Sequence, residues 1–257
     1  FVKLLDVMGN DEEVENAARI SYGEGTRKVS QTRNLIRYLM RHKHSSPFEM
    51  CEVKFHLKLP IFVMRQLVRH RTANLNEYSG RYSVMSNEYY LPEADYLQKQ
   101  SSTNNQGRGE VHPHTGKLHF EFNRIYDNAH IAYENLLEED IARELARTVL
   151  PVANYTECIW KIDLHNFFHF VKLRSDSHAQ REIRDYADAM YELVKPNFPI
   201  CCEAFEDYRQ DAVTFSKQEM EVIREWQDDQ VYDERYLQDK LGKRESKEFL
   251  EKIGEMT

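Results

Sequence analysis

The sequence predicts an α+β fold, in which a mixed sheet is packed with helices and followed by a helical C-terminal extension. Two segments, residues 51–59 and 156–162, alternate apolar and polar side chains with the period of two that is typical of a half-buried strand. The segments around them have helical periodicity, but strands and helices do not alternate regularly as in a parallel α/β fold. At 257 residues the chain is long enough for one sizeable domain with an appendage.

The first part of the chain carries signals for three helices. Asn10 precedes three acidic residues that favour a helix start, and this helix extends towards Ser21. A second helix begins near Ser30 and has one apolar face. After the first strand, Pro60 marks the start of a short helix that ends at His70.

The middle of the chain is less regular. Residues 72–92 are predicted as a loop followed by a strand rich in tyrosine. Residues 101–116 are polar and contain glycine, so we expect a mobile surface loop there. Helices are predicted over residues 117–138 and 140–149, before Pro151.

The last part of the chain is mostly helical. Helices over residues 164–173 and 178–195 follow the second strand. From Phe215 onward charged residues dominate, and we expect a solvated helix.

Composition and charge exclude several classes of protein. A net charge of -8 disfavours a protein that coats nucleic acid, so an anionic ligand must be held by a local group of cations. The four cysteines lack C-x-x-C spacing, which favours a reducing, cytoplasmic location. No apolar run approaches the roughly 20 residues that span a bilayer, and no signal peptide is visible.

Four arginines gather within residues 65–81 of this otherwise acidic chain. The guanidinium group presents a planar fork of donors that suits phosphate oxygens. Arg65 and Arg69 are four apart and share a helix face. Glu77, Ser79 and Gly80 add an acceptor, a hydroxyl and close backbone approach, a mixture that a nucleotide needs. For a generic arginine cluster the alternative is a solvated basic face with a turn.

Five short blocks resemble those of the flavin-dependent thymidylate synthases and occur in the same order. Arg69-His70-Arg71, followed after seven residues by Ser79, is similar to that family's RHR-x7-S signature, and the match continues through Gly80, Arg81 and Tyr82. The other four blocks are Ala18-Arg19-Ile20-Ser21, His44-Ser45-Ser46-Pro47-Phe48-Glu49, Arg143-Glu144-Leu145-Ala146-Arg147 and Leu173-Arg174-Ser175-Asp176-Ser177-His178-Ala179-Gln180. The resemblance implies a catalytic domain that binds FAD and dUMP over residues 1–210 and leaves residues 211–257 as a charged helical extension.

The resemblance also implies the reaction and its site. It implies methylation of dUMP to dTMP with methylenetetrahydrofolate, with FAD reduced by NADPH. FAD is then held by Ser46, Arg69, His70, Arg71, Glu77, Asp163, His165 and His169, with Ser21 and Glu49 as weaker candidates and His44 at the folate and flavin face. Around dUMP it places Gln66, Arg69, Glu77, Ser79, Gly80, Arg81, Arg147 and Arg174. The chain has no G-x-G-x-x-G or P-loop, which fits a flavin held without a Rossmann motif.

Arg174 is the candidate catalytic residue, because its fixed charge can stabilise negative charge that develops as the pyrimidine ionises. Ser79 as a nucleophile is the alternative, but it needs an activating base, so we assign Ser79 to binding. Asp176 and His178 suggest either acid–base catalysis or a helix start. His165 and His169 have a spacing that could ligate a metal, but nothing completes a set, and we expect no metal.

Three features depart from the commoner family pattern. Ser46 stands where threonine is frequent, Asp163 where asparagine often occurs, and His165 and His169 where arginine or asparagine is found. Asp163 brings negative charge towards an electron-rich reduced flavin.

The resemblance implies a homotetramer with shared active sites, in which residues 69–81 and 163–178 meet across chains. We expect neither a polynucleotide nor a membrane as a partner. Two rival functions stay open from the sequence. One is a flavoenzyme or nucleotide-binding enzyme that has lost synthase activity. The other is an RNA-binding module built on the arginines, for which the chain lacks basic excess.

Overall fold

The computed structural model describes residues 1–22, 32–102, 107–228 and 234–254, and it confirms the α+β class. The chain forms two compact units, Phe1–Phe205 and Glu206–Thr257. Ser30, the expected start of the second helix, lies outside the described residues. None of the helices in the described ranges is both long and apolar enough to cross a membrane.

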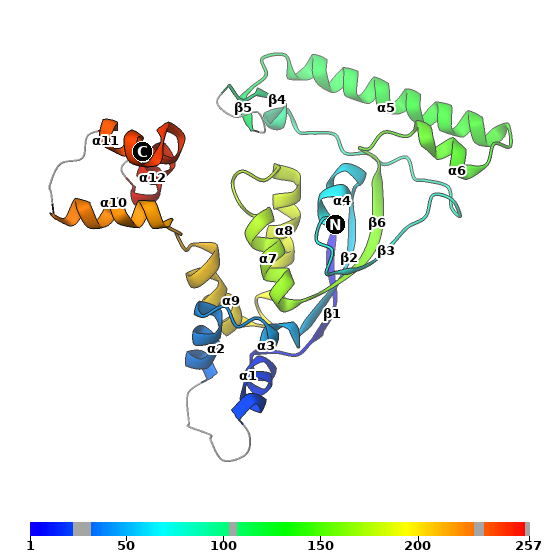
Figure 1. Cartoon of the computed structure of the whole chain (residues 1–257). Helices are drawn as coiled ribbons and strands as arrows, with labels where there is room; N and C mark the ends of the chain where they lie inside the picture. Colours follow the sequence, from blue (N-terminus) through cyan, green and yellow to red (C-terminus); the bar gives the residue numbers. More distant parts are fainter. Residues whose placement is uncertain (23–31, 103–106, 229–233, 255–257) are drawn as a thin grey trace. The chain divides into compact units, whose positions relative to one another are not determined.

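The first unit is built on a four-stranded sheet in the order β1-β2-β6-β3 (Figure 1). Its strands are β1 (Val2–Met8), β2 (Glu52–Pro60), β6 (Tyr155–Asp163) and β3 (Asn74–Glu77). Each neighbouring pair is antiparallel, so the sheet is not the mixed one expected from the sequence. β2 and β6 pair along their whole length, from Glu52 opposite Asp163 to Pro60 opposite Tyr155.

The two strands with clear period-two patterns form the centre of the sheet, which confirms that prediction. Phe55 and Trp160 are 0% and 1% exposed, and their ring centroids lie 6.4 Å apart. Phe167, on the helix after β6, stacks on Phe55 with centroids 5.8 Å apart. Trp160 and its aromatic neighbours are therefore core residues, as expected.

β1 is not predicted by the sequence pattern. Its register shifts between Leu4 and Asp6, which interrupts the alternation of apolar and polar side chains. None of its residues is fully buried, so the strand shows little hydrophobic contrast.

Helices α4, α7 and α8 pack against the strands of this sheet, and α7 and α8 lie side by side (Figure 1). Asn10 caps the first helix, accepting hydrogen bonds from the backbone nitrogens of Glu12 and Glu13 at 2.9 and 3.1 Å. The helices near the sheet are α1 (Asp11–Arg19), α2 (Thr32–Arg41), α3 (Ser46–Glu49), α4 (Ile61–Leu67), α7 (Leu164–Arg174), α8 (Arg181–Val194) and α9 (Pro199–Phe205). A 3-10 turn, η1 (Ile20–Tyr22), follows α1.

Three predictions for the middle of the chain need correction. The surface loop expected over residues 101–116 is wrong at β5 (Arg108–Val111), which pairs with β4 (Gln98–Gln100) in a hairpin, and its residues 103–106 lie outside the described residues. The expected tyrosine-rich strand contributes only the isolated bridge of Tyr89 with Asn154 among the described residues.

The expected helix over residues 140–149 is also broken. Asp140 has a φ of 59°, which ends the preceding helix α5 (Thr115–Glu138). α6 (Arg143–Ala146) and the 3-10 turn η3 (Arg147–Val149) follow. α5 packs against α6, η3 and the 3-10 turn η2 (Ala94–Tyr96).

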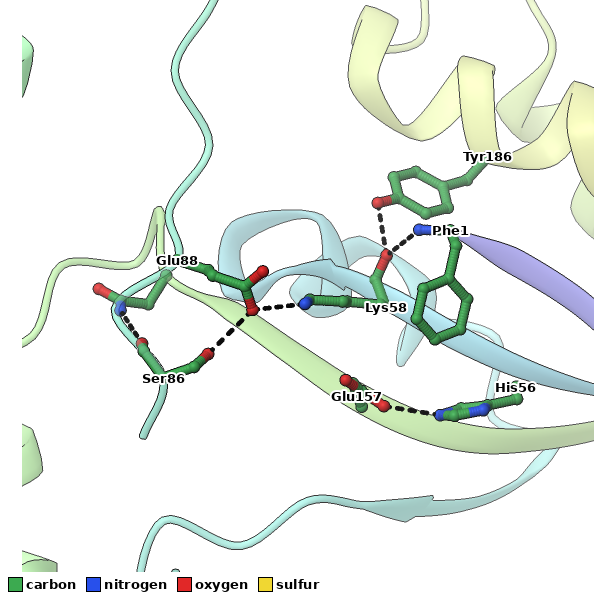
Figure 2. A network of polar contacts seen from close by, with 8 residues as sticks. Phe1, His56, Lys58, Ser86, Glu88, Glu157 and Tyr186 are labelled. Atoms are coloured by element: carbon green, nitrogen blue, oxygen red, sulfur yellow. Dashed lines mark hydrogen bonds and ion pairs between the residues drawn. The ribbon is translucent and has the colours of Figure 1, made fainter. Parts of the chain in front are cut away.

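A polar network joins the end of β2 to neighbouring elements (Figure 2). The main-chain oxygen of Lys58 accepts hydrogen bonds from the Phe1 main-chain nitrogen at 3.1 Å and from the Tyr186 hydroxyl at 2.7 Å. Its ammonium group pairs with Glu88. One residue of β2 thus contacts the residue before β1, a residue of α8 and the segment before β4.

The second unit has a small core of its own. It contains a π-helical turn η4 (Glu206–Gln210) and the helices α10 (Lys217–Asp228), α11 (Glu234–Leu241) and α12 (Lys243–Ile253). Val222, Leu237, Leu241 and Phe249 are buried together. Glu219 is 1% exposed and lies 2.5 Å from the ammonium of Lys252. The expected solvated helix is therefore a packed helical unit.

Candidate functional site

Arg174 connects the end of α7 to the last turn of α4 and to the segment that follows it. Its Nε donates a hydrogen bond to Nε2 of His70 at 3.0 Å, and its Nη2 donates to the main-chain oxygen of Gln66 at 3.4 Å. These contacts lie within one chain. Arg174 and His70 therefore already meet within one chain, and the expected meeting of residues 69–81 with residues 163–178 across chains stays a prediction.

His70 is a neutral acceptor in this arrangement. Burial, the charge of Arg174 and the neighbouring His169 lower the pKa of His70 from 6.5 to about 4. Because Nε2 accepts from Arg174, the ring proton belongs on Nδ1. The ring meets Phe170 edge to face, with centroids 5.0 Å apart.

Arg69 and Arg174 form a pair of like charges. Burial lowers the pKa of Arg174, and the nearby charge of Arg69 lowers it further. Within the described ranges neither guanidinium forms an ion pair with a carboxylate, whereas Arg81 and Arg108 do. Two adjacent guanidiniums without a carboxylate suit an anionic ligand such as a phosphate or an ionised base.

A second group of candidate residues surrounds Gly80. Glu77, at the end of β3, accepts a hydrogen bond from the Thr156 hydroxyl at 2.8 Å. A Cβ atom on Gly80 would lie 2.9 Å from Sδ of Met85 and 3.1 Å from Cδ of Arg147, so the absent side chain lets both side chains approach Gly80 closely. Arg81 pairs with Glu144 at 3.0 Å.

Ser79 is half-buried beside Gly80. Its hydroxyl accepts a hydrogen bond from the backbone nitrogen of Arg81 at 3.3 Å. Among the described side chains no histidine or carboxylate is hydrogen-bonded to Ser79, so the arrangement offers no base to activate it.

The remaining flavin candidates lie around the start of α7. Asp163 is the N-cap of this helix and accepts hydrogen bonds from the backbone and side-chain nitrogens of Asn166 at 2.9 and 2.7 Å. His165 is half-buried and His169 is exposed, with the His169 ring centroid 6.1 Å from that of His70. Ser46 is exposed on α3, which packs against α7. Both carboxylate oxygens of Asp163 thus accept from Asn166, whereas an asparagine at this position would offer only one acceptor oxygen.

The other candidates lie at exposed positions. Ser21, His44, Glu49, Arg69 and Arg71 are exposed. The ring of His44 stacks near Tyr38, with centroids 6.0 Å apart.

His178 and Asp176, for which acid–base catalysis and a helix start are both open from the sequence, contact each other. Nδ1 of His178 lies 2.9 Å from Asp176, and the backbone nitrogen of His178 donates to the same carboxylate at 2.8 Å. Both side chains are exposed, and Arg181 begins the next helix.

The candidate residues form two groups. The first comprises Gln66, Arg69, His70, His169 and Arg174, and the second comprises Glu77, Ser79, Gly80, Arg81 and Arg147. No hydrogen bond or ion pair between described residues joins one group to the other.

One polar chain next to the first group was not expected from the sequence. The side-chain nitrogen of Gln66 donates to Gln180 at 2.6 Å, and Gln180 donates to Glu182 at 2.9 Å. Glu182 lies in the first turn of α8, where an acidic residue is ordinary, so no local pattern distinguishes it.

The amino-acid sequence is similar to those of several known proteins. The family model described as "Thymidylate synthase complementing protein" matches residues 3–200. A flavin-dependent thymidylate synthase of Wolbachia pipientis wMel is 50% identical over 230 residues, which cover 87% of this chain and 80% of the relative. The chain belongs to the flavin-dependent thymidylate synthase family. The flavin-dependent thymidylate synthase of Treponema denticola is 49% identical over 227 residues, which cover 87% of this chain and 85% of the relative.

A solved structure supports the membership in this family. The crystal structure of a UMP/dUMP methylase, PolB, from Streptomyces cacaoi bound with 5-Br dUMP is similar with a TM-score of 0.75 and 34% identity. The similarity covers 82% of this chain and 96% of the methylase. The family resemblance expected from five sequence blocks is thereby confirmed.

Proposed function

We propose that this chain methylates dUMP to dTMP, using methylenetetrahydrofolate as the one-carbon donor and NADPH as the reductant of its FAD. About half of its residues are identical to those of flavin-dependent thymidylate synthases over most of their length. The observation in the structure that best supports this proposal is the pair of guanidiniums of Arg69 and Arg174, which have no carboxylate partner among the described residues.

The donor set fits FAD and a nucleotide monophosphate, both of which carry phosphate. Arg69 and Arg71 are exposed cations beside the half-buried His70 and Arg174. Bound FAD supplies the redox chemistry of the reaction, and the protein supplies orientation and electrostatics.

Arg174 has the role of stabilising charge on the pyrimidine. Its guanidinium is held at two points, by His70 and by the main-chain oxygen of Gln66, so little reorganisation is needed when negative charge develops. Neutral His70 orients the guanidinium without adding a competing positive charge. The second group provides the hydroxyl of Ser79, the backbone of Gly80 with no side chain to block a ligand, and the positive charge of Arg147 for the nucleotide.

We also propose that the active protein is a homotetramer with shared sites, in a cytoplasmic location. α5 exposes Phe120 and Ile131, which lie on one side of the helix, by 65% and 54%, and it buries only Tyr133. Such an apolar helix face favours contact with another subunit. The four cysteines are free, as expected in a reducing compartment.

The visible absorption spectrum of the purified protein tests the flavin first. We expect oxidised FAD bands that bleach with NADPH and return with oxygen. With dUMP and methylenetetrahydrofolate, NADPH oxidation should yield dTMP. Flavin reduction without dTMP indicates a flavoenzyme that has lost synthase activity. A colourless protein that binds polynucleotide with steep salt dependence would favour the RNA-binding alternative. Light scattering checks the tetramer.

A further inference from the structure

We propose that Glu182 is a positioning residue that makes Gln66 present its side-chain oxygen, a hydrogen-bond acceptor, to the nucleotide. The inference rests on the proposed function, because it concerns how dUMP is recognised. It assigns a role to a buried carboxylate that lies outside both groups of candidate residues.

Glu182 is held as an ionised carboxylate. Glu182 is 4% exposed, and Nη2 of Arg108 donates hydrogen bonds to both of its carboxylate oxygens, at 2.6 and 2.7 Å. The hydroxyl of Tyr90 donates to the same group at 2.8 Å. Burial alone raises the pKa of this carboxyl, but the hydrogen bonds from Arg108 and Tyr90 outweigh burial and lower it. Glu182 can therefore accept hydrogen bonds but cannot donate them.

Because Glu182 only accepts hydrogen bonds, it determines the orientation of the Gln180 side-chain amide. Gln180 occupies the N-cap position of α8, yet its side chain does not cap the helix. Its Nε2 donates to Glu182 at 2.9 Å instead. The amide nitrogen must face the carboxylate, so the amide oxygen Oε1 must face the other way.

The orientation of the Gln180 amide in turn determines that of the Gln66 amide. Oε1 of Gln180 is an acceptor, so Gln66 turns its Nε2 towards it, at 2.6 Å. Oε1 of Gln66 is then the atom left for a ligand, and no described residue donates a hydrogen bond to it. The main-chain oxygen of the same residue holds Arg174, so this acceptor belongs to the first group of site residues.

An acceptor at this place selects a hydrogen-bond donor on the nucleotide. The base and sugar of dUMP offer two: the ring N3–H and the 3′-hydroxyl of the sugar. If the amides ran in the opposite direction, Gln66 would present an NH2 group, and either donor of the nucleotide would be left unpaired.

The test compares dUMP binding to flavin-loaded Glu182→Gln with binding to the unmodified protein. A glutamine at position 182 can donate as well as accept, so it no longer fixes the amide direction. We expect about a tenfold weaker Kd for dUMP, the loss of roughly one hydrogen bond. Tyr90→Phe is the matched control, because it removes a hydrogen bond from the same carboxylate and leaves the chain to Gln66 intact; its Kd should stay within about twofold.

A double-mutant cycle separates positioning from general stability. In a Gln66→Ala background the Glu182→Gln change should leave the Kd for dUMP nearly unaltered, since the residue through which it acts is gone. An equal loss in both backgrounds, or a Kd within about twofold for Glu182→Gln alone, would overturn the proposal. If Glu182→Gln does not fold, Gln180→Met replaces it, because Gln180 is exposed and carries both hydrogen bonds of the chain.

Two nucleotide analogues identify the contacted donor. The effect of Glu182→Gln should vanish with 3-methyl-dUMP if Gln66 contacts the ring, or with 2′,3′-dideoxyuridine monophosphate if it contacts the sugar. Persistence of the effect with both analogues refutes the contact with Gln66. If the unmodified protein fails to bind dUMP, the proposed function itself is refuted, which is a different result from unaltered binding by the variant.

Discussion

Protonation of His70 should destabilise the folded protein between pH 6.5 and 4. Its pKa is lowered to about 4 in the folded chain, so as the pH falls below 6.5 the unfolded chain takes up a proton that the folded chain does not. Stability from the neutral ring is therefore fully present above pH 6.5 and is lost as the pH approaches 4. His70→Gln removes this titration and keeps an acceptor for Arg174.

The magnitude follows from the two pKa values. The difference between 6.5 and about 4 corresponds at most to roughly 3 kcal/mol, since one pKa unit is about 1.4 kcal/mol. The ring is partly exposed to water, which reduces the expected loss to about 2 kcal/mol.

Denaturant unfolding of the flavin-free protein and of His70→Gln at pH 7 and pH 4.5 measures this loss. The other ten histidines are the same in both proteins, so the difference between the two pH dependences isolates His70. We expect the unmodified protein to lose about 1–2 kcal/mol more than the variant over this range. Identical pH dependences would refute the neutral ring and its hydrogen bond from Arg174.

Four further substitutions test the site and the second unit. Arg174→Ala should retain FAD but lose most dTMP formation; near-normal turnover would remove Arg174 from its proposed role. Ser79→Ala should keep measurable activity, and complete loss with dUMP still bound would favour a serine nucleophile. Gly80→Ala places a carbon 2.9 Å from Sδ of Met85 and 3.1 Å from Cδ of Arg147 and should weaken the Kd for dUMP about tenfold; an unaltered Kd would show that close packing at Gly80 is unimportant for binding. Glu219→Ala should destabilise the second unit by about 1–3 kcal/mol, seen as faster hydrogen exchange over residues 217–253, and unaltered exchange would contradict a structural role.

The centre of the fold could be predicted from the sequence because its signal is local. Phe55 and Trp160 lie in strands whose two faces differ sharply in polarity, and Asn10 is a strong helix cap. β1 lacks that contrast, since its bulge between Leu4 and Asp6 shifts the alternation. The hairpin of β4 and β5 is built mostly from polar residues and lacks an apolar alternation, and one of them, Arg108, pairs with the distant Glu182.

The candidate site shows the same division. The arginines are visible in the sequence as an unusual gathering of charge, and the family blocks indicate their neighbours. The contact of Arg174 with His70 joins residues 104 positions apart, and that of Gln66 with Gln180 joins residues 114 apart. Such pairings depend on the packing of α7 and α8 on the sheet, and no short-range pattern carries them.

The antiparallel pairing of β2 with β6 makes the length of α7 important. α4 leaves the end of β2 at Pro60, whereas α7 leaves β6 beside the opposite end of β2, at Asp163. α7 must therefore run back along the sheet for 11 residues before Arg174 reaches His70. One inserted residue would turn every later side chain by about 100° and move it by about 1.5 Å. We therefore expect insertions and deletions in this helix to be tolerated less well than exchanges of its exposed side chains.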